Sequence, residues 1–141
     1  MKLHGSALLV VLALMMVGDS VAQTIRVKAD VPFAFIVNGS TLSAGQYTIQ
    51  SFGSVDGKTL LLRNADKNEN ATVNSINVES RKTASETKLV FHRYGDRYFL
   101  SEVWVAGNEL GRALPASHRE QELARDYDRH FQEVNVVAAM R

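Results

Sequence analysis

The sequence predicts a mainly β protein: a β-sandwich or small β-barrel of about seven antiparallel strands with one C-terminal α-helix. Segments in which apolar and polar residues alternate recur along residues 25–105, separated by turns rich in Gly, Asn and Asp. A strong hairpin signal lies in the second half of this region, and helical spacing appears only after Pro115. Period-two patterns do not report how the strands close, so sandwich and barrel remain alternatives.

The N-terminal residues 1–22 have the layout of a secretory signal peptide. A basic residue, Lys2, precedes an apolar run over residues 7–17, and the small residues of 18–22 lead to an expected cleavage site before Gln23. The run is too short to cross a bilayer, which needs about 20 residues. We therefore expect export to the periplasm or the extracellular space, with no transmembrane segment left after cleavage.

The composition fits one compact exported domain. The formal net charge of the 141 residues is +1, and the charges are interspersed, so no nucleic-acid partner is expected. The chain has no cysteine, which excludes disulfides, thiolate metal ligands and a thiol nucleophile. Stability must come from the apolar core, and no cofactor is expected.

The expected β-rich domain spans residues 23–116. Its strands are expected at residues 25–30, 31–37, 46–50, 58–63, 71–78, 88–94 and 97–105. Pro32 cannot donate to a ladder, which places it at a strand start, an edge or a bulge. Residues 79–87 contain little to bury and are expected to form the most mobile internal loop.

The hairpin signal joins residues 88–94 to residues 97–105 through Gly95 and Asp96. Glycine at the first turn position is typical of a type II′ turn. Both faces of the two strands are apolar away from the turn, so we expect the hairpin to lie inside a sheet.

The two-residue turn sets the expected register of this hairpin. An unbroken register places Leu89 opposite Glu102. Trp104 then shares the face of Leu100, and a core position is expected for it.

The last segment changes to helical spacing. Ser117 and Glu120 form a capping-box pattern that opens a helix expected over residues 117–134, and residues 135–141 are expected to be a tail. One apolar stripe of this helix can dock on the sheet, formed by Leu123, Tyr127, Phe131 and Val134.

The hairpin tip is the best candidate binding site. Two arginines and two tyrosines near one turn can stack, hold a carboxylate or phosphate, or present a flat surface to a sugar ring. The alternative is that such cross-strand pairs only stabilise the sheet, by about 0.2–1 kcal/mol each. The candidate residues are His92, Arg93, Tyr94, Arg97 and Tyr98.

A candidate metal site lies on the expected helix, where four possible ligands follow one another at spacings of four: His118, Glu122, Asp126 and His130. The two histidines would lie about 18 Å apart, so one ion cannot contact both. Each neighbouring pair could supply two ligands and would need others from elsewhere. The alternative is a solvated helix face with weak charge pairs.

No catalytic residues are assigned. The sequence lacks the Gly-x-Ser-x-Gly and His-Glu-x-x-His patterns and any glycine-rich phosphate loop. We therefore expect a non-catalytic exported β-domain that acts as a cell-envelope or extracellular interaction module, with a glycan, peptide or protein as its partner. The alternative is a metal-assisted hydrolase that uses the four helical residues named above.

Two sequence segments resemble segments of known proteins. Residues 31–49 (VPFAFIVNGSTLSAGQYTI) and 88–100 (KLVFHRYGDRYFL) resemble a group of short exported bacterial proteins described as hypothetical. The likeness runs from about residue 27 to about residue 124, and Ser43 stands where proline is expected. The resemblance implies an exported protein of the Gram-negative type and brings no activity, cofactor or catalytic residue.

Overall fold

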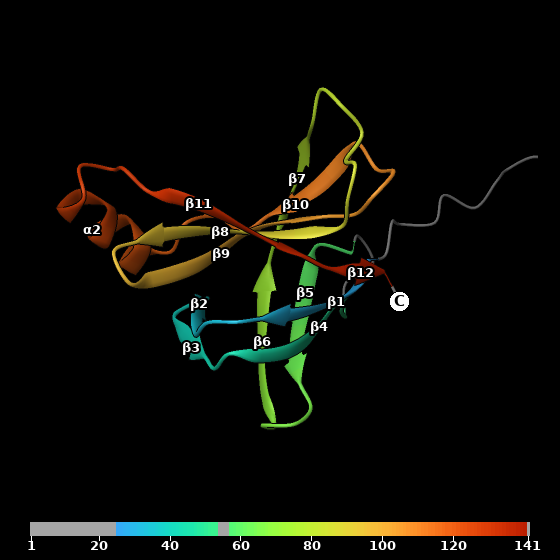
Figure 1. The fold of residues 1–141 in the computed structure, drawn as a ribbon, viewed down its shortest axis with the longest axis horizontal. Helices are drawn as coiled ribbons and strands as arrows, with labels where there is room; N and C mark the ends of the chain where they lie inside the picture. The colour runs from blue at the N-terminus through green and yellow to red at the C-terminus, as the bar shows by residue number, and fades with distance from the viewer. Residues whose placement is uncertain (1–24, 54–56, 141) are drawn as a thin grey trace, which may run out of the picture.

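The computed structural model describes residues 25–53 and 57–140, so the expected signal peptide and the cleavage site before Gln23 lie outside the described residues. The described chain forms twelve strands in two sheets and one helix near the C-terminus. The sheets face one another in a sandwich-like arrangement and are not closed into a barrel (Figure 1). The predicted mainly β class with a C-terminal helix is confirmed, although the strands are more numerous than expected.

The first sheet is antiparallel throughout and has the strand order β12-β1-β4-β5-β6. Its inner face follows the period-two pattern of the sequence, with Val27, Ala29 and Val31 of β1 all buried. The strands are β1 (Arg26–Val31), β4 (Gly45–Ser51), β5 (Thr59–Asn64), β6 (Glu69–Asn74) and β12 (Ala139–Met140).

The second sheet has the order β11-β8-β9-β10-β7, with β2 beside β9 and β3 beside β2. All its pairs are antiparallel except β2 with β9, which pair in parallel through Ile36 and Phe99. The strands are β2 (Phe35–Val37), β3 (Ser40–Leu42), β7 (Ile76–Glu79), β8 (Lys88–Tyr94), β9 (Arg97–Trp104), β10 (Leu110–Ala113) and β11 (Gln132–Val137).

The strand expected over residues 31–37 is divided between the two sheets. Val31 ends β1 in the first sheet, and Phe35 begins β2 in the second. Pro32 lies in the connection, where its missing N–H costs no ladder hydrogen bond. The chain therefore changes layers at this proline.

The core lies between the sheets and is built from alternating apolar side chains of both. Phe35 contacts Tyr47 and Phe91 edge to face, with ring centroids 5.0 and 5.4 Å apart. Burying an aliphatic or aromatic side chain of this size contributes about 1.5–3 kcal/mol. In a cysteine-free chain, this packing takes the place of covalent cross-links.

The predicted hairpin is confirmed, and both of its strands lie inside the sheet. The register matches the expected one as far as the pair Phe91 and Leu100, and then a β-bulge leaves Ser101 without an opposite residue. Beyond the bulge, Leu89 lies opposite Val103 rather than Glu102, so that register prediction is wrong.

The bulge also corrects the position of Trp104. An extra residue changes which face each later side chain occupies, so Val103 and Val105 enter the core. Trp104 turns outward and is half-buried on the outer face of the sheet, not in the core.

The helix α2 (His118–Asp126) is shorter than the one expected over residues 117–134, although Ser117 caps it as predicted. Asp128 and Arg129 adopt left-handed backbone angles, which end the helical path. Residues 132–137 form β11 against β8, and the residues expected as a tail continue into β12 against β1. The valine-rich alternation of this segment suits a half-buried strand better than a helix.

The C-terminal segment therefore joins the two sheets (Figure 1). Val134 and Val136 pack against the core from β11, and the N–H of Ala138 donates to the carbonyl of Thr87 between the two strands. We expect a chain ending at residue 131 to lose about 2–3 kcal/mol of stability and about 10 °C in Tm, because two valines leave the core. Thermal denaturation followed by circular dichroism measures this loss.

A chain ending at residue 138 is the control for this truncation, because it lacks only β12 and should melt close to the full chain. An unchanged Tm for the chain that ends at residue 131 would contradict the stabilising role of β11.

A carboxylate ties the turn between β3 and β4 to the start of β6. The N–H and hydroxyl of Ser43 donate to the two carboxylate oxygens of Glu69 at 2.9 and 2.8 Å, and the hydroxyl of Tyr47 donates to the carbonyl of Ser43 at 2.6 Å. The hydrogen bonds from Ser43 lower the pKa of Glu69. The ionised carboxylate is therefore the form that holds the turn.

A lowered folded-state pKa means that Glu69 stabilises the fold above the ordinary carboxyl range and loses this effect as the pH falls through the folded-state value. We expect Glu69→Gln to lower the Tm at pH 7 and to have little effect in acid, once the wild-type carboxylate is protonated. Melting curves across this pH range test the expectation. Glu133→Gln on the exposed face of β11 is the control, and a Tm difference independent of pH would refute the role of the charge.

Candidate functional site

The predicted binding residues lie at the tip of the β8–β9 hairpin, beside α2 (Figure 1). The register divides them between the two faces of the hairpin, because residues directly opposite share a face. Tyr94 lies opposite Arg97, and His92 lies opposite Phe99, on the face toward α2. Arg93 and Tyr98 form a pair on the other face. The five residues do not make one surface.

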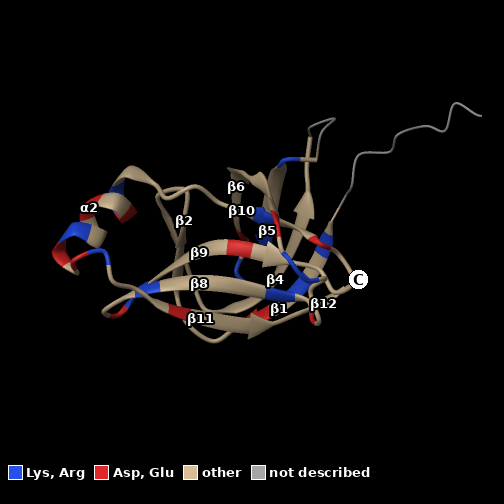
Figure 2. Cartoon of the chain, turned by 90° about the horizontal axis from the view of Figure 1, so that it is seen from above, with Lys and Arg blue, Asp and Glu red and all other residues tan. Residues whose placement is uncertain are grey.

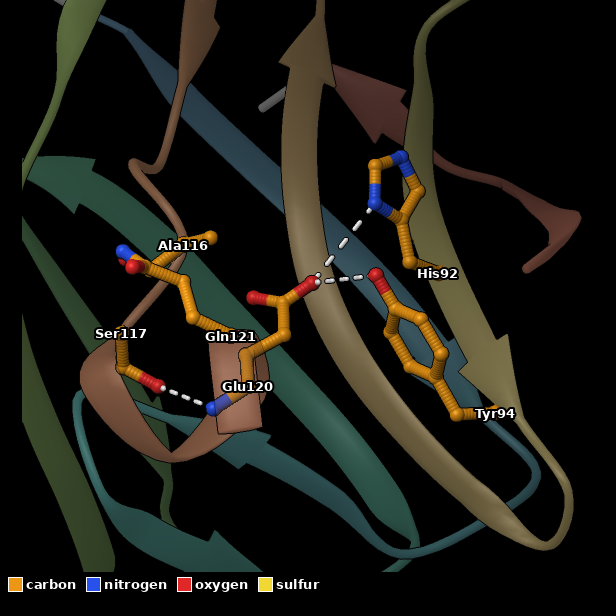
Figure 3. Close-up of polar contacts among 6 residues, drawn as sticks. All are labelled: His92, Tyr94, Ala116, Ser117, Glu120 and Gln121. Atoms are coloured by element: carbon orange, nitrogen blue, oxygen red, sulfur yellow. Dashed lines mark hydrogen bonds and ion pairs between the residues drawn. The ribbon is translucent and has the colours of Figure 1, made fainter. Parts of the chain in front are cut away.

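A buried carboxylate joins the first face to the helix. The Tyr94 hydroxyl donates to Oε1 of Glu120 at 3.3 Å, and Nδ1 of His92 lies 3.7 Å from the same oxygen (Figure 3). Tyr94 and Glu120 are only 5 % and 7 % exposed. Glu120 is held there because Ser117 caps the helix, its hydroxyl accepting from the N–H of Glu120 at 3.2 Å.

Aromatic side chains close this face from outside. Phe131 stacks on His92, with ring centroids 3.8 Å apart, and Tyr127 lies against the turn at Gly95. A Cβ at residue 95 would meet the hydroxyl of Tyr127, which is exposed and can move aside, so the backbone angle φ of +62° is the reason that the turn favours glycine. Tyr94 is therefore buried, whereas the His92 side chain stays 22 % exposed beside Phe131.

The opposite face carries a second stack. The ring of Tyr98 lies 3.8 Å from that of Phe33 and nearly parallel to it, and the guanidinium of Arg93 lies 5.3 Å from the centroid of Tyr98. Nε of Arg93 also donates to the carbonyl of Gly95 at 2.6 Å. Arg93 and Tyr98 are both half-buried by these contacts.

Arg97 is the exposed member of the five, and it lies at an open depression between the hairpin tip and α2. The depression has a volume of about 400 Å³ and is lined by Arg97, Arg119, Glu122, Leu123, Arg125 and Asp126. Figure 2 shows basic and acidic segments side by side on α2. Arg119 and Arg125 are not among the site residues predicted from the sequence. Arg119, Glu122 and Arg125 follow one another at intervals of three residues, and this spacing places side chains on one face of a helix.

The electrostatic environment of Tyr94 favours its hydrogen bond to Glu120. Burial and the neighbouring carboxylate both raise the pKa of Tyr94, so the phenol stays protonated and donates its hydrogen bond. A cavity of about 230 Å³ with a mixed polar and apolar lining adjoins Glu120 between β2, β6, β9 and the start of α2, and it is smaller than most ligand pockets. The hydrogen bond between Tyr94 and Glu120 therefore holds α2 against the hairpin.

The predicted metal ladder is not assembled. His118 and Glu122 form an exposed pair with 3.1 Å between Nε2 and Oε1, but Asp126 is the last residue of α2 and His130 lies beyond the left-handed turn. Within residues 25–53 and 57–140, no three His, Cys, Asp or Glu side chains lie close enough together to hold a metal ion. The ladder required a helix that continues to residue 130, and the chain turns before it.

Comparisons with known proteins identify no relative: no protein-family model matches the chain, and neither a curated protein nor a solved structure matches it. In the part of the chain that the structure describes, no helix has the length and apolar character to cross a membrane.

We expect Tyr94→Phe to destabilise the protein by about 1–3 kcal/mol, because the buried carboxylate loses its hydroxyl donor. A double-mutant cycle with Glu120→Gln, measured by urea denaturation, should show coupling between the two residues. Tyr98→Phe is the control, since the ring keeps its stack on Phe33. Additive effects of Tyr94→Phe and Glu120→Gln would show that the two groups do not support one another.

Proposed function

We propose that the protein is exported and acts, in the periplasm or outside the cell, as a non-catalytic interaction module. The signal-peptide layout of residues 1–22 supports export. The mainly β domain with its buried core supports a scaffold that carries a surface site. Its partner is a glycan, peptide or protein of the envelope that bears a carboxylate or phosphate group.

One observation carries the proposal: three arginines from two separate elements line the same open depression. Arg97 comes from the start of β9, and Arg119 and Arg125 come from α2. Among the described residues, none of these three guanidinium groups forms an ion pair. The planar fork of a guanidinium matches a carboxylate or phosphate with two hydrogen bonds, so the three together suit an anionic group.

The rigid surroundings favour recognition over chemistry. The hairpin tip is held in place by the stacking of Tyr98 on Phe33 and by the buried hydrogen bond of Tyr94 to Glu120. The backbone of Arg97 therefore has a fixed position. Glu122 and Asp126 line the same depression and would repel a ligand of dense negative charge. This mixture favours a single anionic group on a larger partner.

The double variant Arg97→Ala and Arg125→Ala tests this proposal. We expect its retention on immobilised envelope material of the host to fall at least about tenfold, because two charge-assisted hydrogen bonds are lost. The Tm should be unchanged, since both side chains are exposed. Retention of the wild type should also weaken as ionic strength rises.

Arg63→Ala on β5 removes an exposed arginine from the other sheet and is the matched control. Equal losses in the control and the double variant would indicate a non-specific charge effect. Full retention by the double variant would refute the proposed site.

A further inference from the structure

The single tryptophan of the chain lies on the outer face of the second sheet, at the end of β9 far from the hairpin turn. A Cβ built at Gly111 of β10 would come within 2.6 to 2.8 Å of three neighbouring indole atoms of Trp104. Nearly equal distances to adjacent ring atoms mean that Gly111 faces the flat side of the indole. The ring therefore lies flat on β10, in space that only glycine leaves open.

A hydrogen bond fixes the orientation of this ring. Nε1 of Trp104 donates to Oε2 of Glu102 at 2.7 Å, from two positions earlier on the same strand. An indole packed on the backbone and held at its nitrogen has little freedom to rotate. The sheet thus presents a fixed, partly exposed aromatic surface.

A groove of about 380 Å³ runs between this indole and the segment before β8. Besides Trp104, its lining is mostly hydroxyl-bearing and charged, and consists of Ser80, Lys82, Thr83, Ala84, Ser85, Glu86 and Lys88. The lining carries Lys82, Lys88 and Glu86, and the carboxylate of Glu102 at the indole nitrogen brings the local charge to two positive and two negative groups. A groove of this kind offers many neutral donors and acceptors and little net field.

The wall of the groove, within residues 79–87, is held by hydrogen bonds, although the sequence predicts a mobile loop there. Ser80 and Ala84 donate their N–H groups to the carbonyls of Glu109 and Asn108, and Gly107 donates to the carbonyl of Ala84. The N–H of Ala106 donates to the Thr87 hydroxyl at 3.0 Å. The groove is therefore largely formed before any ligand arrives, which lowers the entropic cost of binding.

We propose that this groove binds a neutral saccharide, with one sugar ring stacked on Trp104. The indole offers a flat apolar face, and the hydroxyl, ammonium and carboxylate groups around it can bond the hydroxyl groups at the rim of a sugar. The balanced charge does not favour a polyanion, which needs a basic surface. The site lies at the opposite end of the hairpin from the arginine depression and does not depend on the function proposed above.

Intrinsic fluorescence tests the proposal directly, because Trp104 is the only tryptophan in the sequence. Titration of the full chain with cellotetraose, chitotetraose and maltotetraose should give a saturable change in emission with at least one of them. Isothermal titration calorimetry then compares variants. We expect Trp104→Ala to weaken binding about tenfold or more, as loss of a stacked aromatic does in other ring-binding sites, and Trp104→Tyr to weaken it less.

Two further variants separate binding from folding. The pair Thr83→Ala and Ser85→Ala removes two exposed hydroxyls without touching the core, and it should weaken binding several-fold with an unchanged Tm. Phe52→Ala removes an exposed aromatic ring outside the groove and should bind like the wild type. A saccharide that binds Trp104→Ala as tightly as the wild type overturns the proposal.

Two other results would also overturn it. The first is the absence of any saturable response to the three tetrasaccharides up to about 10 mM. The second is saturable binding of adenosine without binding of saccharides, which would assign the indole to nucleobase stacking.

Discussion

The register of the β8–β9 hairpin, with the bulge at Ser101, is the constraint on which both surfaces of the protein depend. On the turn side of the bulge, Phe91 and Leu100 face the core. On the far side, one extra residue brings Val103 into the core and turns Trp104 outward. The hairpin thus keeps apolar side chains on its inner face on both sides of the bulge, and its outer face differs at the two ends.

The two ends of the outer face are used in different ways. Near the turn, α2 and Phe131 cover it, and the buried carboxylate of Glu120 is compensated by the hydroxyl of Tyr94. At the other end, the indole of Trp104 stays partly open because Gly111 leaves room for it to lie flat. A rigid central hairpin can therefore hold one site at each end without a change in the core between them.

The C-terminal segment closes a fold that has no disulfide. After α2, the chain runs along β8 and then reaches β1, the first strand of the other sheet. Its side chains Val134 and Val136 contribute to the core from the edge of the second sheet. One continuous segment thus links the two layers through backbone hydrogen bonds, and it places strands at edges that would otherwise be open.

Local patterns in the sequence determined the β class, the hairpin turn at Gly95 and the helix start at Ser117, because turn chemistry and capping act within a few residues. Of the candidate site, Arg97 could be found from the hairpin alone, whereas its neighbours on α2 could not. Only the tertiary structure decided the bulge at Ser101 and the place of Trp104, whereas the valine alternation of residues 132–137 already favours an early end of the helix. Each depends on which faces meet in the core, and packing between distant segments overrides local spacing.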